Sequence, residues 1–207
     1  MHIAAKATVL FATLLFLISM SAPIYAGTEP PPVDSTAQQQ PDITETQIIE
    51  WPDGAGWHLA NSYVAGSSDY SLYFPKDQGE ENWREMVILE VVHGKGNVKT
   101  NLPGLARMTY LGTRKGSPNA TWEILEKGYS DEAKEYPHII YEIDCPDFLS
   151  KEPAQVQIWK LTDGKTALFN LQYSYRGKEM PPDKKEEIMT MLKKSHIKAE
   201  KNEAATE

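Results

Sequence analysis

Cys145 is the residue with the clearest chemical potential, because it is the only cysteine among 207 residues. A nucleophilic cysteine needs a base within hydrogen-bond reach and an electropositive setting. Asp144 and Asp147 provide negative charge instead. His138 lies seven residues earlier on the same predicted strand, more than about 20 Å away at about 3.3 Å per residue. The sequence therefore favours a cysteine that packs at a strand end, without an internal disulfide.

The sequence lacks the other common patterns of catalytic and metal-binding residues. The histidines do not show His-x-x-x-His spacing, no Cys-x-x-Cys pair is available, and Gly-x-Ser-x-Gly is absent. We therefore predict no catalytic residue, no metal and no cofactor. A small secreted hydrolase built around Cys145, His138 or the carboxylates remains an alternative to a binding function.

A basic stretch follows the third predicted strand and continues into the first predicted helix. His93-Gly-Lys95-Gly is rich in glycine but lacks the Gly-Lys-Ser/Thr ending of a phosphate-binding loop, which favours a simple connection. Arg107, Arg114 and Lys115 add further positive charge to this part of the chain. If an anionic ligand binds, we expect it to bind here.

The tryptophans could form an aromatic cradle, although packing in the core explains most of them more simply. Trp159 is the exception, because alternation places it on the strand face opposite Val156 and Ile158. The predicted ligand-binding residues are therefore His93, Lys95, Arg107, Arg114, Lys115 and Trp159.

The first twenty-six residues have the features of a secretory signal peptide. Lys6 provides the positive start, residues 7–20 are almost entirely apolar, and Ala26 gives a small-residue exit. The apolar run is shorter than the roughly 20 residues that span a bilayer. No second such run follows, so we expect a periplasmic or secreted protein without a membrane span once the leader is removed.

The formal net charge of −8 disfavours binding to nucleic acid, which depends on lysine and arginine. Loss of Lys6 with the leader makes the protein one unit more negative. The expected partner is instead a protein or another component of the cell envelope. Five Trp, ten Tyr and five Phe supply apolar area for a core that needs no disulfide.

Composition divides the chain into four parts. Residues 27–46 are polar and rich in proline, and therefore predict a disordered linker. Residues 199–207 predict a disordered acidic tail. The divisions are a signal peptide at 1–26, a linker at 27–46, a single α+β domain at 47–198 and a tail at 199–207.

Apolar periodicity predicts an antiparallel sheet of about seven strands, because most strands follow one another directly. Asp163-Gly164 between two apolar runs is the strongest hairpin signal. Strands are predicted at 57–63, 70–74, 87–92, 121–126, 139–145, 155–161 and 166–175, and helices at 102–114 and from 181 onward. We expect both helices to pack on one face of the sheet.

Two segments resemble parts of small exported bacterial proteins of unassigned function. They are Glu81-Asn-Trp-Arg-Glu-Met-Val87 and the strand ending Leu171-Gln-Tyr-Ser-Tyr-Arg176, with Cys145 and Asp163-Gly164-Lys165 between them. The order of elements is similar to that of PsbP-like α/β sandwich domains. The resemblance implies a binding or assembly accessory rather than an enzyme, and transfers no functional residue. An effector that acts on a host is a further alternative.

Overall fold

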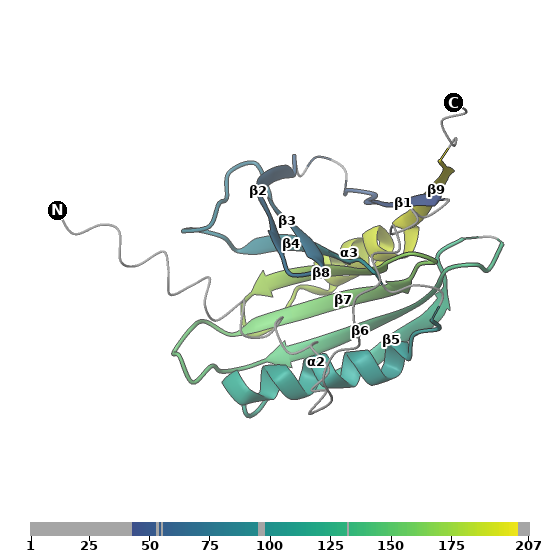
Figure 1. Cartoon of the computed structure of the whole chain (residues 1–207). Coiled ribbons are helices and arrows are strands. Elements are labelled where there is room, and N and C mark those ends of the chain that lie inside the picture. Colours follow the sequence, from purple (N-terminus) through teal and green to yellow (C-terminus); the bar gives the residue numbers. More distant parts are fainter. Residues whose placement is uncertain (1–42, 53, 55, 95–97, 132, 203–207) are drawn as a thin grey trace.

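A seven-stranded antiparallel sheet forms the centre of the protein (Figure 1). The computed structural model describes residues 43–202, except 53, 55, 95–97 and 132. The spatial order of the strands is β2-β3-β4-β8-β7-β6-β5. They are β2 (His58–Ala65), β3 (Ser68–Phe74), β4 (Glu85–Val92), β5 (Thr121–Tyr129), β6 (Pro137–Cys145), β7 (Gln155–Asp163) and β8 (Leu168–Arg176). The helices are α2 (Leu102–Gly116) and α3 (Pro182–Lys194). The predicted α+β class and seven-stranded antiparallel sheet are confirmed.

The hairpin between β7 and β8 forms at the predicted turn, where Asp163 pairs with Leu168. Gly164 is needed there because a Cβ atom at this position would lie 2.6 Å from the Ala167 carbonyl oxygen. The turn sets the register of the two central strands, and thereby decides which side chains share a face.

The two helices cover opposite faces of the sheet, so the prediction that both pack on one face is wrong. Leu102 of α2 shares a core cluster with Ile139, whereas Ile188 of α3 shares another with Ile140. Successive residues of a strand point to opposite faces, so these neighbours on β6 place the helices on different sides. Figure 1 shows α2 beside β5 and β6, and α3 apart from it beside β8.

This arrangement explains the burial of the central strands. All nine residues of β7 are buried, which requires cover on both faces of the sheet. Trp159 and Leu161 belong to the cluster on the α2 side, and Ile158 belongs to the cluster on the α3 side. The core is therefore a pair of layers separated by the sheet.

A second, two-stranded sheet corrects the predicted ends of the domain. β1 (Ile43–Ile48) pairs antiparallel with β9 (His196–Lys201). Residues 43–46 of the predicted linker and 199–201 of the predicted tail therefore belong to strands. The predicted signal peptide, the rest of the linker and residues 203–207 of the tail lie outside the described residues. The Gln47 side chain donates hydrogen bonds to the carbonyls of Ile48 (3.0 Å) and His196 (3.1 Å).

A buried lysine holds the end of α3 against the sheet. Lys160 of β7 is 1 % exposed, and its Nζ donates to the carbonyl oxygens of Leu192 (2.9 Å) and Ser195 (2.5 Å). A cation at this position satisfies carbonyls that have no partner within the helix and complements the helix dipole. Burial lowers the pKa of this amine from 10.5 to about 8.

Candidate functional site

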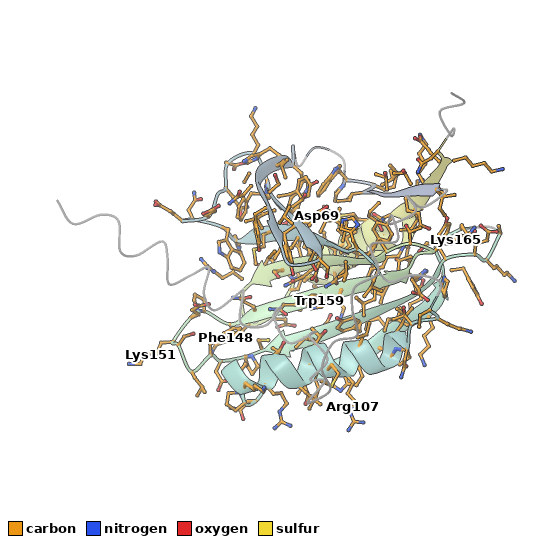
Figure 2. The ribbon with its side chains drawn as sticks, viewed as in Figure 1. Asp69, Arg107, Phe148, Lys151, Trp159 and Lys165 are labelled. Atoms are coloured by element: carbon orange, nitrogen blue, oxygen red, sulfur yellow. The ribbon has the colours of Figure 1, made fainter. Side chains whose placement is uncertain are left out.

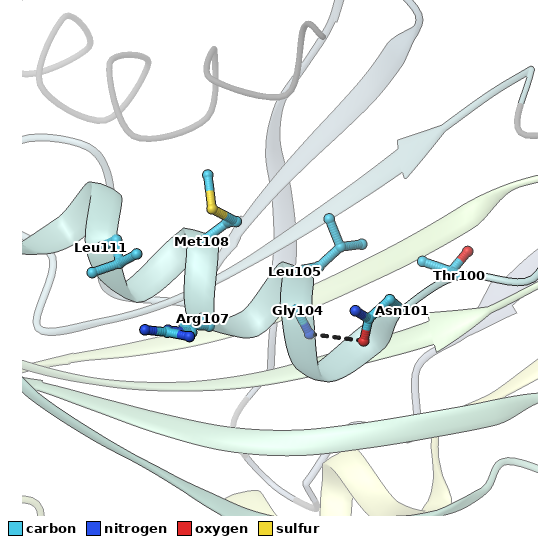
Figure 3. Close-up of a pocket in the computed structure, with 7 residues that line it drawn as sticks. All are labelled: Thr100, Asn101, Gly104, Leu105, Arg107, Met108 and Leu111. Carbon is cyan, nitrogen blue, oxygen red and sulfur yellow. Dashed lines mark hydrogen bonds between the residues drawn. The ribbon is translucent and has the colours of Figure 1, made fainter.

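A shallow depression of about 550 Å³ lies along the outer side of α2 (Figure 3). Its walls come from the first three turns of the helix and the two residues before them. The lining residues are Thr100, Asn101, Gly104, Leu105, Arg107, Met108 and Leu111. Figure 3 shows Met108 and Leu105 pointing to the same side of the helix.

The helix that carries this depression has well-defined ends. The Asn101 side chain accepts a hydrogen bond from the Gly104 amide at 3.1 Å, and Pro103 stands in the first turn. At the other end the Ser117 amide donates to the Thr113 carbonyl. A Cβ atom on residue 104 would lie 2.6 Å from the Asn101 amide nitrogen, so glycine keeps the cap in place.

The inner side of α2 packs on the sheet and thereby fixes which residues face outward. Leu102, Ala106 and Thr113 are buried, and they follow helical spacing. Met108 and Leu111 fall on the other side, with exposed fractions of 59 % and 41 %. We define the outer face of α2 as Arg107, Met108, Leu111, Arg114 and Lys115.

The outer face of α2 combines exposed apolar and basic side chains. The helix contains no Asp or Glu, although the whole chain has a formal charge of −8. Arg107 and Arg114 are seven residues apart, or about 10 Å along the axis. Within residues 43–202, neither arginine forms an ion pair. Arg114 instead donates to the Pro118 carbonyl at 3.3 Å.

The structure brings together three of the predicted ligand-binding residues and separates the others. Arg107, Arg114 and Lys115 share α2, and Figure 2 shows Arg107 pointing away from the sheet. His93 follows β4 and pairs with Asp69 of β3 at 2.7 Å. Lys95 lies outside the described residues.

Trp159, the remaining predicted residue, lies on the sheet rather than on the helix (Figure 2). It is 6 % exposed and stacks on Tyr141 with ring centroids 5.9 Å apart. The prediction that it faces away from Ile158 is confirmed, because the two belong to clusters on opposite faces. Trp159 is therefore a buried member of the core cluster beneath α2, and the prediction that it is the exception to core packing is wrong.

Sequence reasoning missed Met108 and Leu111, because together with Leu105 they follow the spacing of an apolar helix stripe. The signal was present, because arginines interrupt that stripe on both sides. The other side of the helix, through Ala106 and Thr113, carries no charged residue, and this side packs on the sheet.

The geometry around Cys145 is that of a packed side chain. Cys145 is fully buried in the cluster beneath α2. Burial first, and then the neighbouring Asp144, raise the pKa of its thiol to about 12. Cys145 and His138 occupy odd and even positions of β6, so they point to opposite faces of the sheet. They cannot form a nucleophile–base pair.

A row of polar side chains, all buried except the half-buried Asn170, lies on the same sheet face as α2. We call it the polar strip, and it is formed by Gln155, Gln157, Asn170, Gln172 and Ser174 of β7 and β8. Gln157 lies opposite Ser174, and Gln157 is only 2 % exposed. Alternating polar residues normally mark the wet face of a strand, so alternation alone does not predict the burial of these positions.

Several atoms in and beside the polar strip have no hydrogen-bond partner among the described residues. They are Gln157 Oε1, Trp159 Nε1, Asn170 Oδ1 and Arg176 Nε. Other atoms of the strip are paired, such as Gln172 Nε2 with Ser174 Oγ at 2.8 Å. Most buried polar atoms in folded proteins are paired, so these four need an explanation.

Comparisons with known proteins assign no family to this chain. No protein-family model and no curated protein matches it. The PsbP-like resemblance therefore stays a prediction. Within the described part of the chain, no group of three His, Cys, Asp or Glu side chains is arranged to hold a metal ion. Neither helix between residues 43 and 202 is long and apolar enough to cross a bilayer.

Proposed function

We propose that this protein is an exported, non-enzymatic binding module that docks a partner protein on the outer face of α2. The observation that carries the proposal is the exposure of Met108 and Leu111 between Arg107 and Arg114 in a shallow depression. Isolated exposed apolar side chains are normal, but a cluster rimmed by polar residues marks an interaction site.

The chemistry of the face defines the partner. Burying Met108 and Leu111 would contribute roughly 1.5–3 kcal/mol each before the costs of association. Arg107, Arg114 and Lys115 would meet carboxylates, so the partner should present an apolar patch beside acidic residues. Because the rest of the chain is acidic, this is where such a partner is attracted rather than repelled.

Export is the second element of the proposal. Lys6, the apolar run at residues 7–20 and the small Ala26 support cleavage of a leader and work in the periplasm or outside the cell. Mass spectrometry of protein from fractionated cells should find an N-terminus near Gly27 in the periplasm or the medium. An intact N-terminus in the cytoplasm would contradict this element.

The hydrolase alternative loses the version built on Cys145 and His138, and only the version built on the carboxylates remains. Burial of the thiol and the opposite orientation of the two side chains support a packing role for Cys145. No observation favours an effector that acts on a host over a module that acts in the cell envelope. Cell fractionation separates the two functions, because an effector would be found in the medium.

Photo-cross-linking in the native cell tests the docking surface. A cross-linking amino acid in place of Met108 should give a discrete adduct with another protein. The matched control is the same substitution at Val64, which is 73 % exposed on β2, at the edge of the sheet remote from α2. Identical adducts from both positions, or no adduct from position 108, would refute the proposal.

A further inference from the structure

We propose that the segment which docks on the outer face of α2 is an amphipathic α-helix of the partner protein, with carboxylates seven residues apart beside its apolar stripe. This inference rests on the proposed docking at that face and specifies which structure of the partner fits there. It starts from three features that α2 combines: an exposed apolar stripe, two arginines at a helical spacing and a shallow depression along the axis.

The apolar stripe lies on the side of α2 that faces away from the sheet. Met108 and Leu111 form its centre, with Gly104 one turn before them and the aliphatic stem of Lys115 one turn after. Leu149, which is 71 % exposed, adds an apolar side chain beyond the helix, where its amide donates to the last helical carbonyl at 2.8 Å. From residue 104 to residue 115 the axis rises about 16 Å, which matches about three turns of a second helix.

Two arginines lie on one flank of this stripe. Arg107 and Arg114 are seven residues apart, so they lie within about 20° of each other around the helix. The Arg114 guanidinium is positioned 5.9 Å from the centroid of the Tyr110 ring, and that ring stacks on Trp122 at 5.5 Å. Carboxylates seven residues apart on a second helix repeat at the same distance of about 10 Å, so both can pair with the arginines at once.

Other modes of polypeptide binding do not match this surface. Addition of a strand needs the open edge of a sheet, whereas the backbone groups of α2 pair along the helix. Recognition of a polyproline helix uses a groove lined by aromatic rings, and none of the seven residues that line the depression is aromatic (Figure 3). An α-helix pairs its own backbone groups and binds through side chains, which this face provides.

Charge argues against two other occupants. Because α2 contains no Asp or Glu, two copies of the chain packed through this helix would place arginine opposite arginine. An anionic membrane surface would attract the arginines but repel the rest of the chain, whose formal net charge is −8. A helix with acidic residues on one flank satisfies the arginines and leaves the remaining acidic surface of the protein in water.

Photo-cross-linking at three positions distinguishes a bound helix from an extended segment. The cross-linking amino acid replaces Met108, Leu111 or Lys115 of the full chain in the native cell, and mass spectrometry identifies the linked residues of the partner. Positions 108 and 115 are about 10 Å apart along the axis. On a helix their adducts should lie about seven residues apart, with the adduct from position 111 between them. On an extended segment the same distance spans only about three residues.

Charge exchange with the mapped segment completes the test. The segment should carry two acidic residues seven apart, and replacing both by Lys should weaken binding by at least about tenfold. Combining that change with Arg107→Glu/Arg114→Glu should restore binding. Adducts about three residues apart, scattered adducts or failure of the exchange to restore binding would overturn the helix while leaving the docking surface in place. Absence of protein adducts from all three positions would overturn the docking surface and this inference with it.

Discussion

The buried amine of Lys160 makes the stability of this protein depend on pH in a way that can be isolated with one substitution. The folded pKa of about 8 lies below the unfolded value of 10.5. At a pH between about 8 and 10.5, Lys160 keeps its proton in the unfolded chain and loses it in the folded chain. The free energy of unfolding therefore rises with pH through this window and is lowest below it.

The size of the effect follows from the two pKa values. One pKa unit corresponds to about 1.4 kcal/mol, so the full cost of charging Lys160 in the folded state approaches about 3 kcal/mol. Between pH 7.5 and 9.5, roughly 2 kcal/mol of this cost should be relieved. Lys160→Met removes the titrating group but keeps the length of the side chain. The unfolding free energy of this variant should therefore lack the pH-dependent contribution of Lys160.

Urea unfolding of the parent and of Lys160→Met at pH 7.5, 8.5 and 9.5 measures the effect. The difference in unfolding free energy, parent minus variant, should increase by about 2 kcal/mol across this range. Lys178→Met, at an exposed position, is the control and should show a constant difference. A constant difference for Lys160→Met would refute the assignment of a buried amine that loses its proton near pH 8.

Two further predictions concern α2 and the residues beneath it. Asn101→Ala should lower the free energy of unfolding by about 1 kcal/mol in urea titration, because the Gly104 amide loses its cap; no loss would contradict the cap. The Cys145 thiol, buried and with its pKa raised to about 12, should resist iodoacetamide at pH 8 until urea unfolds the protein. Labelling of native protein at the rate of a free thiol would contradict its packing beneath the helix.

Local patterns predicted the elements of the main sheet because they depend on residues close in sequence. The Asp163-Gly164 turn and the alternation through Phe169 and Tyr173 specify one hairpin almost by themselves. The start of α2 was equally readable from Pro103 and its surroundings. These features required no knowledge of distant residues.

The side on which each helix packs could not be predicted in the same way, because it depends on pairs of distant residues. Ile139 and Ile140 are both apolar, so β6 has no single apolar face that would select one helix. Near-continuous apolarity at residues 87–92, in β4, indicates cover on both faces of the sheet, but it does not say which helix covers which face. The pairing of β1 with β9 joins chain ends about 150 residues apart, and neither segment has a strong strand pattern of its own.

The candidate site was only half predictable for a related reason. Arg107 and Arg114 were identified by their charge, which follows directly from the residue type. The exposure of Met108 depends on which of two possible helix stripes meets the sheet. The burial of Gln157 depends on the layers around the strand, so alternation alone could not predict it.

The affinity between this protein and the partner captured at position 108 tests the central claim most directly. It should be measured at low ionic strength with Arg107→Glu/Arg114→Glu and with Lys178→Glu, a charge reversal at an exposed position outside α2. The double variant should weaken binding by at least about tenfold and flatten its dependence on salt, while Lys178→Glu binds like the parent. Equal affinities for the parent and the double variant would contradict the outer face of α2 as the docking surface.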